Sequence, residues 1–165
     1  MVTLRIHLIE ARGLAPKDSN GLADPYAVIR FSTSKKQTKT IYKTLDPVWD
    51  QGFSFDVNGG SSVVNITLWD KDTLGRDYMG EINVPAKHLF TRNCPRDEYH
   101  EGGQPMEFND PRNMPVWYAV QSRNNNEQVS GSVLIKAGLY DNGKMHSDEE
   151  WIHGWSTICA QLAKQ

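Results

Sequence analysis

Five aspartates fall in two short, glycine-containing segments of a chain whose net charge is only -2. Asp18 and Asp24 lie in PKDSNGLADPY, and Asp70, Asp72 and Asp77 lie in WDKDTLGRD. Two like charges 4 Å apart cost about 1 kcal/mol even in bulk water, and several times more near a protein surface. A cation between the two segments would remove this repulsion. The sequence therefore predicts that the aspartates converge on a metal ion.

The chemistry of these side chains favours calcium. Ca²⁺ takes six to eight oxygen ligands and favours carboxylates, whereas Mg²⁺ keeps several of its waters. No cluster of histidines and cysteines accompanies the aspartates, which argues against zinc. Any single aspartate could merely start a turn, so the prediction depends on the whole set.

An EF-hand loop is the competing interpretation of the second segment. Asp70, Asp72, Gly75 and Glu81 would occupy its positions 1, 3, 6 and 12. Position 5 would be Leu74, which offers no ligand, and the flanking VVNITLW and EINVP are strand-like where an EF-hand needs helices. We reject this alternative.

Short runs of alternating apolar and polar residues precede and follow the two aspartate segments and predict the strands that position them. In VTLRIHLIEA the apolar residues occupy every second place, so one face is apolar and the other polar. Similar runs rich in β-branched or aromatic residues follow between turn-rich segments, over residues 2–11, 25–31, 36–42, 52–57, 63–69, 78–85, 116–122 and 130–140. Eight strands at near-regular spacing predict an all-β, antiparallel sandwich. Alternate loops of a sandwich lie at the same end, so the five aspartates can meet there.

Two segments interrupt the strand pattern. Residues 86–115 are polar and proline-rich, a long excursion that is usually functional. Ser147 and Glu150 form a capping box. It precedes apolar residues at helical spacing, which we expect to dock on the sandwich: Trp151, Ile152, Trp155, Ile158, Cys159 and Leu162. We expect a domain over 1–141 and a helical extension over 142–165.

Composition excludes several classes of protein. With 38% hydrophobic and 23% charged residues, the 165-residue chain is typical of a globular domain. It contains no apolar run of about 18 residues and no signal-peptide pattern at its start. Cys94 and Cys159 are expected to be reduced thiols, as in a cytoplasmic protein.

Three motifs in order resemble a known family. The segments D-S-N-G-L-A-D-P-Y, T-L-D-P-V-W and W-D-K-D-x4-D-Y-M-G are similar to the signatures of C2 domains, and in particular of the C2 domain of conventional protein kinase C. The resemblance implies an eight-stranded sandwich in the second of the family's two topologies. It also implies two or three Ca²⁺ ions held by the five aspartates, although Asp72 and Asp77 are separated by four residues where many members have five.

The resemblance implies calcium-dependent binding of anionic phospholipids, which would target a larger protein to the membrane. Five carboxylates carry a charge of -5, and two Ca²⁺ ions return +4. The loop end would therefore be repelled from an anionic leaflet without metal and nearly neutral with it. We expect phosphatidylserine as a ligand and peripheral membrane association from the cytoplasm.

Further residues are candidates for lipid contact. Residues 25–45 contain no acidic residue and five basic ones, a pattern that attracts phosphoinositide headgroups, although edge strands also carry lysines to prevent aggregation. A lysine of the protein kinase C phosphoinositide site is replaced by Gln37. The apolar residues of the loop tips are candidates for insertion. The full set of expected lipid-contact residues is Tyr26, Lys35, Lys36, Lys39, Trp69, Leu22, Leu74 and Arg76.

Catalysis and nucleic-acid binding find little support. The chain has no G-x-S-x-G, no phosphate-binding glycine loop and no H-E-x-x-H. The basic run is short and lacks the stacking aromatics of nucleic-acid modules. The alternative function is a calcium-independent protein-interaction module that would use residues 86–115 or the C-terminal helix.

Overall fold

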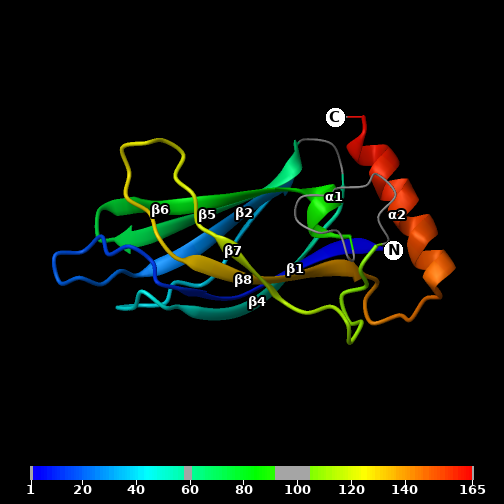
Figure 1. The fold of residues 1–165 in the computed structure, drawn as a ribbon, viewed down its shortest axis with the longest axis horizontal. Helices are drawn as coiled ribbons and strands as arrows, with labels where there is room; N and C mark the ends of the chain where they lie inside the picture. Colours follow the sequence, from blue (N-terminus) through cyan, green and yellow to red (C-terminus); the bar gives the residue numbers. More distant parts are fainter. Residues whose placement is uncertain (1, 58–60, 92–104, 165) are drawn as a thin grey trace.

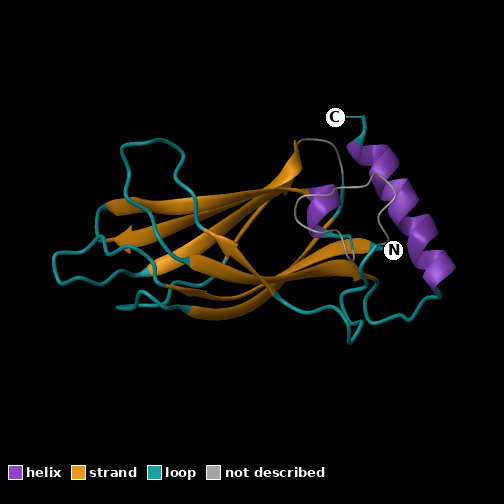
Figure 2. Cartoon of the chain, viewed as in Figure 1, coloured by secondary structure: helices purple, strands orange, loops and turns teal. Residues whose placement is uncertain are grey.

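The protein is a sandwich of two four-stranded antiparallel sheets with a helix at one end (Figures 1 and 2). The computed structural model describes residues 2–57, 61–91 and 105–164. Sheet 1 has the strand order β4-β1-β8-β7, and sheet 2 has the order β3-β2-β5-β6. The elements are β1 (Thr3–Arg12), β2 (Pro25–Ser32), β3 (Ser34–Gln37), β4 (Val48–Phe55), β5 (Ser61–Asp72), β6 (Gly75–Pro85), α1 (Ala86–Leu89), β7 (Val116–Ala119), β8 (Ser132–Tyr140) and α2 (Asp148–Leu162).

The core lies between the two sheets and follows from the alternation in the sequence. Leu4, Ile6 and Leu8 of β1 are fully buried, while the residues between them face outward. Ile29 of β2 and Ile66 of β5 face them from the other sheet and are equally buried. The all-β sandwich predicted from the sequence is confirmed. Its assignment to the second topology of the family stays a prediction.

The third expected strand is shifted. The sequence pattern predicted a strand over 36–42, but β3 ends at Gln37. The backbone then leaves the β2–β3 ladder because the side chain of Thr38 replaces a backbone acceptor. The amide of Thr38 donates to the Ala27 carbonyl, but the amide of Ala27 donates to Thr38 Oγ1 at 3.0 Å. Residues 38–47 therefore form a loop at the same end as the aspartates.

The hairpin of β5 and β6 is longer than expected. The sequence pattern placed a loop over residues 70–77, whereas the structure pairs Asp70 with Asp77, Lys71 with Arg76 and Asp72 with Gly75. Only two residues remain in the turn. The three aspartates of this segment are therefore held by strand pairing and not by an irregular loop.

The long excursion is partly described. Residues 92–104, including Cys94, lie outside the described residues. After them the chain runs beside β8, where the amide of Phe108 donates to the Leu139 carbonyl and the amide of Leu139 donates to the Met106 carbonyl. Buried Asn113 fixes this segment because its Nδ2 donates to the carbonyls of Glu107 and Ala137 at 3.1 and 3.0 Å. We call residues 105–113 the strap.

Helix α2 covers the end of the sandwich opposite the aspartates (Figure 1). The predicted capping box at Ser147 and Glu150 is confirmed. Trp151, Trp155, Ile158 and Leu162 join the main core, and the rings of Trp155 and Phe90 lie 6.5 Å apart. Ile152 is 43% exposed, so its assignment to the docked apolar face of the helix was wrong.

Candidate calcium site and lipid-contact surface

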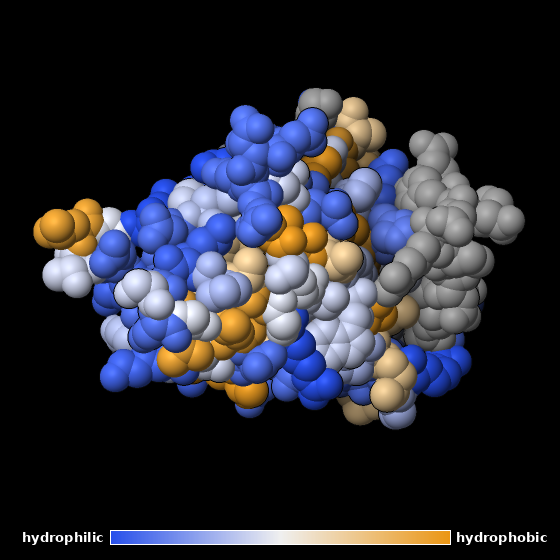
Figure 3. Space-filling view, turned by 60° about the vertical axis from the view of Figure 1, so that its left-hand side comes forward, coloured by the Kyte–Doolittle hydropathy of each residue, from blue (hydrophilic) through white to orange (hydrophobic). Residues whose placement is uncertain are grey.

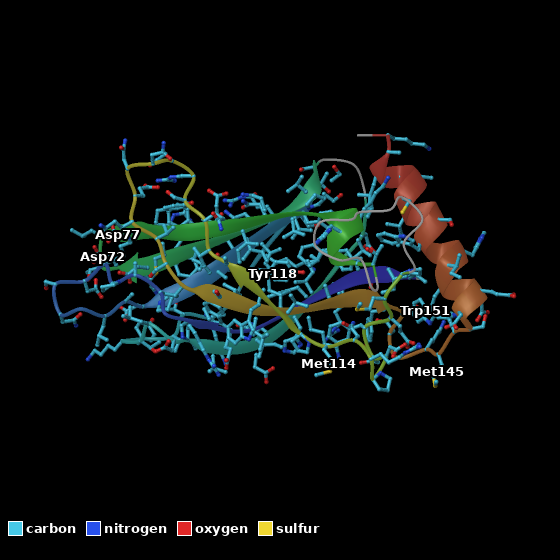
Figure 4. The ribbon with its side chains drawn as sticks, viewed as in Figure 1. Asp72, Asp77, Met114, Tyr118, Met145 and Trp151 are labelled. Atoms are coloured by element: carbon cyan, nitrogen blue, oxygen red, sulfur yellow. The ribbon has the colours of Figure 1, made fainter. Side chains whose placement is uncertain are left out.

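Four connections meet at one end of the sandwich. They are the β1–β2 loop (13–24), the β3–β4 loop (38–47), the β5–β6 turn (73–74) and the β7–β8 loop (120–131). We call this end the rim. Figure 4 shows Asp72 and Asp77 at the rim and Trp151 at the far end of the molecule. Antiparallel strand order thus brings together the two aspartate segments that the sequence separates.

Three of the five predicted aspartates form a close cluster. One carboxylate oxygen from each of Asp18, Asp24 and Asp70 lies within 4.8 Å of the others. Asp18 comes from the β1–β2 loop, Asp24 immediately precedes β2, and Asp70 belongs to β5, which pairs directly with β2. We call these three residues the aspartate cluster.

Backbone groups fix the orientation of the cluster. The amide of Asp24 donates to Asp70 Oδ1 at 2.7 Å, and the amide of Lys43 donates to Asp24 Oδ1 at 2.7 Å. Lys43 adopts a left-handed backbone with φ 54, which places its amide beneath the cluster. Asp70 Oδ2 is buried and accepts no hydrogen bond from any of the described residues.

Asp70 is the residue whose protonation this arrangement changes most. Its side chain is 0% exposed. Burial, together with the neighbouring charges of Asp18 and Asp24, raises the pKa of Asp70 to about 6, although the hydrogen bond from the Asp24 amide lowers it. The metal-free cluster is therefore electrostatically unfavourable.

The residues present fit a calcium ion. An unpartnered buried carboxylate oxygen is costly and calls for a missing partner. The donors are carboxylates alone, as a hard oxygen-seeking cation requires. Asp18, Asp24 and Asp70 would hold the ion, which would supply the positive charge that the cluster lacks.

Asp72 and Asp77 lie near the cluster in sequence but outside the close group of three. Both are exposed on the β5–β6 hairpin. Asp72 Oδ1 accepts a hydrogen bond from the amide of Thr73 at 2.6 Å, so the side chain is bonded to the backbone of the β5–β6 turn. Their role in binding metal stays a prediction.

Three expected lipid-contact residues, Tyr26, Trp69 and Arg76, meet on the outer face of sheet 2. Tyr26 and Trp69 are direct neighbours across β2 and β5. The guanidinium of Arg76 lies 3.8 Å from the centroid of the Trp69 ring, and Tyr78 meets that ring edge-on at 5.7 Å. The Trp69 indole is thus held between a cation and a second aromatic ring.

The lysines of residues 25–45 do not all point to the same side of the sheet. Lys35 and Lys39 are exposed, whereas Lys36 is directed between the sheets. Its Nζ donates to the Ser54 carbonyl at 2.5 Å and lies 5.1 Å from the centroid of the Phe55 ring. Lys36 follows the buried face because it pairs with Ile29 in the β2–β3 register. The structure therefore brings Lys35 and Lys39 to the surface but not Lys36.

The tips of the rim carry apolar side chains. Leu74 is 97% exposed, Leu22 is half-buried, and Tyr42 of the β3–β4 loop is 61% exposed. Tyr42 was missed because the sequence pattern placed it in a strand. In Figure 3, with the rim turned forward, hydrophobic residues appear only in small groups on a largely polar face, one of them on a projecting tip.

Within the described parts of the chain, no helix has the length and apolar character needed to cross a membrane.

Comparison with known proteins gives one family. A model of the C2 domain family matches residues 2–101. The Rho GTPase-activating protein gacEE of Dictyostelium discoideum is 32% identical over 130 residues, 78% of this chain and 20% of that protein. The mouse protein named multiple C2 and transmembrane domain-containing protein 1 is 39% identical over 99 residues, 58% of this chain and 10% of that protein. The chain thus spans only a small part of these relatives.

Solved structures give the same fold. A calcium-bound pair of C2 domains from extended synaptotagmin 2 matches with a TM-score of 0.59 at 22% identity, covering 83% of this chain and 45% of that one. A single C2 domain of a plant extended synaptotagmin 1 matches with a TM-score of 0.58 at 19% identity, covering 86% of this chain and 96% of that one. The family match, covering more than half of the chain, and the shared sandwich together establish that this chain belongs to the C2 domain family.

Proposed function

We propose that this C2 domain binds anionic phospholipid membranes when calcium occupies the aspartate cluster. The observation that carries the proposal is Asp70 Oδ2, a buried carboxylate oxygen without a partner among the described residues, beside two further carboxylates. An ion there would turn three converging negative charges into a site with open coordination positions for the oxygens of a phosphate or serine headgroup. Two or three ions were expected, and the cluster would hold the first.

Exposed side chains around the cluster supply the membrane contact. Leu74 and Tyr42 would enter the interface, and neutralising the cluster would remove its repulsion from an anionic leaflet. Lys35 and Lys39 would add attraction for phosphoinositides of about 1 kcal/mol each near the surface. Because C2 domains are non-catalytic modules, we propose that the chain targets a longer protein to membranes.

The test is co-sedimentation with phosphatidylserine vesicles in calcium and in chelator. Wild type should pellet only with calcium. Asp70→Asn should abolish calcium-dependent pelleting, because the amide keeps the hydrogen bond from Asp24 but provides no negative charge. Asp56→Asn is the matched control, since exposed Asp56 follows β4 at the end of the sandwich away from the rim. Equal pelleting of wild type in calcium and chelator would refute the proposal.

The alternative of a protein-interaction module would have to use the outward face of α2 or the long excursion. The apolar face of α2 is buried against the core, so it is not available to a partner. Much of the other predicted surface, residues 92–104, lies outside the described residues. Absence of pelleting under both conditions would favour a protein partner.

A further inference from the structure

A group of basic side chains occupies the outer face of sheet 1, far from the rim. Arg5 and His7 are on the outward face of β1, and Lys136 of β8 lies directly opposite His7. The strap places Phe108 among them, over Gly138, which is opposite Arg5. We call Arg5, His7 and Lys136, with the Phe108 ring, the basic cluster.

The Phe108 ring orders these side chains. Its centroid lies 5.2 Å from Arg5 Cζ and 4.6 Å from Lys136 Nζ, and the His7 ring stacks beside it at 6.2 Å. The centroid of the Tyr140 ring lies 4.7 Å from Arg5 Cζ. An aromatic face attracts a cation, but only by about 0.5–1 kcal/mol at exposed sites, and it carries no net negative charge.

Arg5 and Lys136 carry the two full charges of the basic cluster, and neither is paired with a carboxylate of the described residues. Within the described ranges, neither Arg5 nor Lys136 has a carboxylate within ion-pair distance, although other basic residues such as Arg12 and Arg123 do. Arg5 Nε is buried and has no hydrogen-bond partner in the part of the chain that the structure describes. The acidic neighbour Asp50 is bonded to His7 at 2.6 Å on the β4 side.

These cations are matched to a doubly charged anion. A phosphate monoester carries about -1.5 to -2 charges and three strong acceptor oxygens. A guanidinium can bind two of those oxygens in parallel, and an ammonium can bind a third. A single carboxylate would leave one of the two positive charges uncompensated.

The position of the basic cluster argues against a membrane held at the rim as the source of the anion. At roughly 3.3 Å per residue, Arg5 lies about 23 Å from the rim end of β1 at Arg12, and Lys136 lies about 13 Å from the rim end of β8 at Ser132. Charges are screened beyond about 8 Å at physiological ionic strength. A membrane held at the rim therefore exerts little attraction on this face. We propose that the basic cluster binds a phosphate monoester carried by a protein partner, independently of calcium.

The direct test is an NMR titration of the ¹⁵N-labelled chain in chelator at constant ionic strength, with phenyl phosphate and with a glycine pentapeptide carrying a central phosphoserine. We expect saturable shifts of the amides of His7, Lys136 and Gly138 with both probes. Phenol and the unphosphorylated pentapeptide should produce none.

Substitutions locate the binding. Arg5→Gln and Lys136→Gln should each weaken the affinity for both probes at least tenfold. Lys35→Gln, an exposed lysine on the other sheet, should leave it unchanged. Lys136 forms no hydrogen bond or ion pair among the described residues, so Lys136→Gln keeps the test valid if Arg5→Gln lowers the melting temperature.

Three results would overturn the proposal. Shifts that do not saturate at 20 mM would show that the cations merely hold the strap in place. Unchanged affinity in Lys136→Gln would place the anion elsewhere. Loss of calcium-dependent vesicle pelleting in Lys136→Gln would assign the basic cluster to a lipid headgroup. Because the titration contains no calcium, its outcome does not depend on the calcium site.

Discussion

The aspartate cluster and the basic cluster present opposite charges, and neither the aspartates of the first nor Arg5 and Lys136 of the second form an ion pair among the described residues. At the rim, carboxylates from the β1–β2 loop and β5 converge until one oxygen is buried without a partner. On sheet 1, a guanidinium and an ammonium are gathered around one aromatic ring. In both places the fold holds like charges together at a cost that a ligand of opposite charge would remove.

The two clusters differ in how the repulsion between their like charges is reduced when no ligand is bound. A carboxyl group can take up a proton, and Asp70 does so more readily than an ordinary aspartate because its pKa is raised to about 6. A guanidinium remains charged at any accessible pH, and Arg5 instead contacts the rings of Phe108 and Tyr140. We therefore expect the rim to respond to pH and divalent metal, and Arg5 and Lys136 to respond to anions.

Calcium should produce the largest effect that separates the two clusters. A ligand at one hundred times its dissociation constant stabilises the folded state by about 2.7 kcal/mol. For a chain of this size that corresponds to a rise of roughly 5–10 °C in melting temperature. Thermal unfolding of wild type and Lys136→Gln should show this rise, and Asp70→Asn should not. An equal rise in Asp70→Asn would place the ion outside the aspartate cluster.

The pH dependence of stability should show a smaller effect, confined to the rim. In chelator, folded Asp70 has a raised pKa of about 6 against an unfolded value of 3.8. Between these values the folded state binds more protons than the unfolded state, so stability falls as pH rises. The loss attributable to Asp70 should be about 2 kcal/mol between pH 4 and pH 7, since one pKa unit corresponds to about 1.4 kcal/mol.

Urea unfolding at several pH values measures this contribution as the difference between wild type and Asp70→Asn. In saturating calcium the fall of wild-type stability with rising pH should reverse, because the ion binds the ionised carboxylates and protons compete with it. Arg5→Gln serves as the control from the other cluster and should leave the slope unchanged. A wild-type slope identical to that of Asp70→Asn would contradict the raised pKa.

The aspartate cluster was accessible from sequence because its residues belong to ordered motifs. Asp18, Asp24 and Asp70 were identified together, and the sandwich followed from period-two alternation. Alternation could not reveal that the hairpin extends to Asp72, since strand pairing there depends on the partner strand and not on local pattern. It also could not show that Lys36 points inward, because that depends on the β2–β3 register.

The basic cluster could not have been found from sequence. Alternation does place Arg5 and His7 on the polar face of β1, but Lys136 lies opposite His7 only through the register of β1 with β8. Phe108 comes from the strap, which has no periodicity, and it fits over β8 because Gly138 has no side chain: a Cβ there would lie 2.6 Å from the Phe108 backbone. Such a contact between distant segments leaves no local signal.

The smallest of these effects concerns how the rim contacts a membrane once calcium is bound. Leu74 is 97% exposed, so replacing it by serine removes apolar surface without disturbing the core. Complete burial of a leucine is worth about 1.5–3 kcal/mol, and partial insertion into the interface roughly half of that. This predicts about a tenfold loss of vesicle affinity for Leu74→Ser.

Calorimetry of Leu74→Ser should show an unchanged affinity for calcium, because the side chain provides no ligand. Met145→Ser removes an apolar residue that is 90% exposed at the opposite end of the molecule (Figure 4), and it should leave vesicle binding unchanged. If Leu74→Ser binds vesicles like wild type, the calcium-loaded rim attracts the bilayer by charge alone and the turn stays in water.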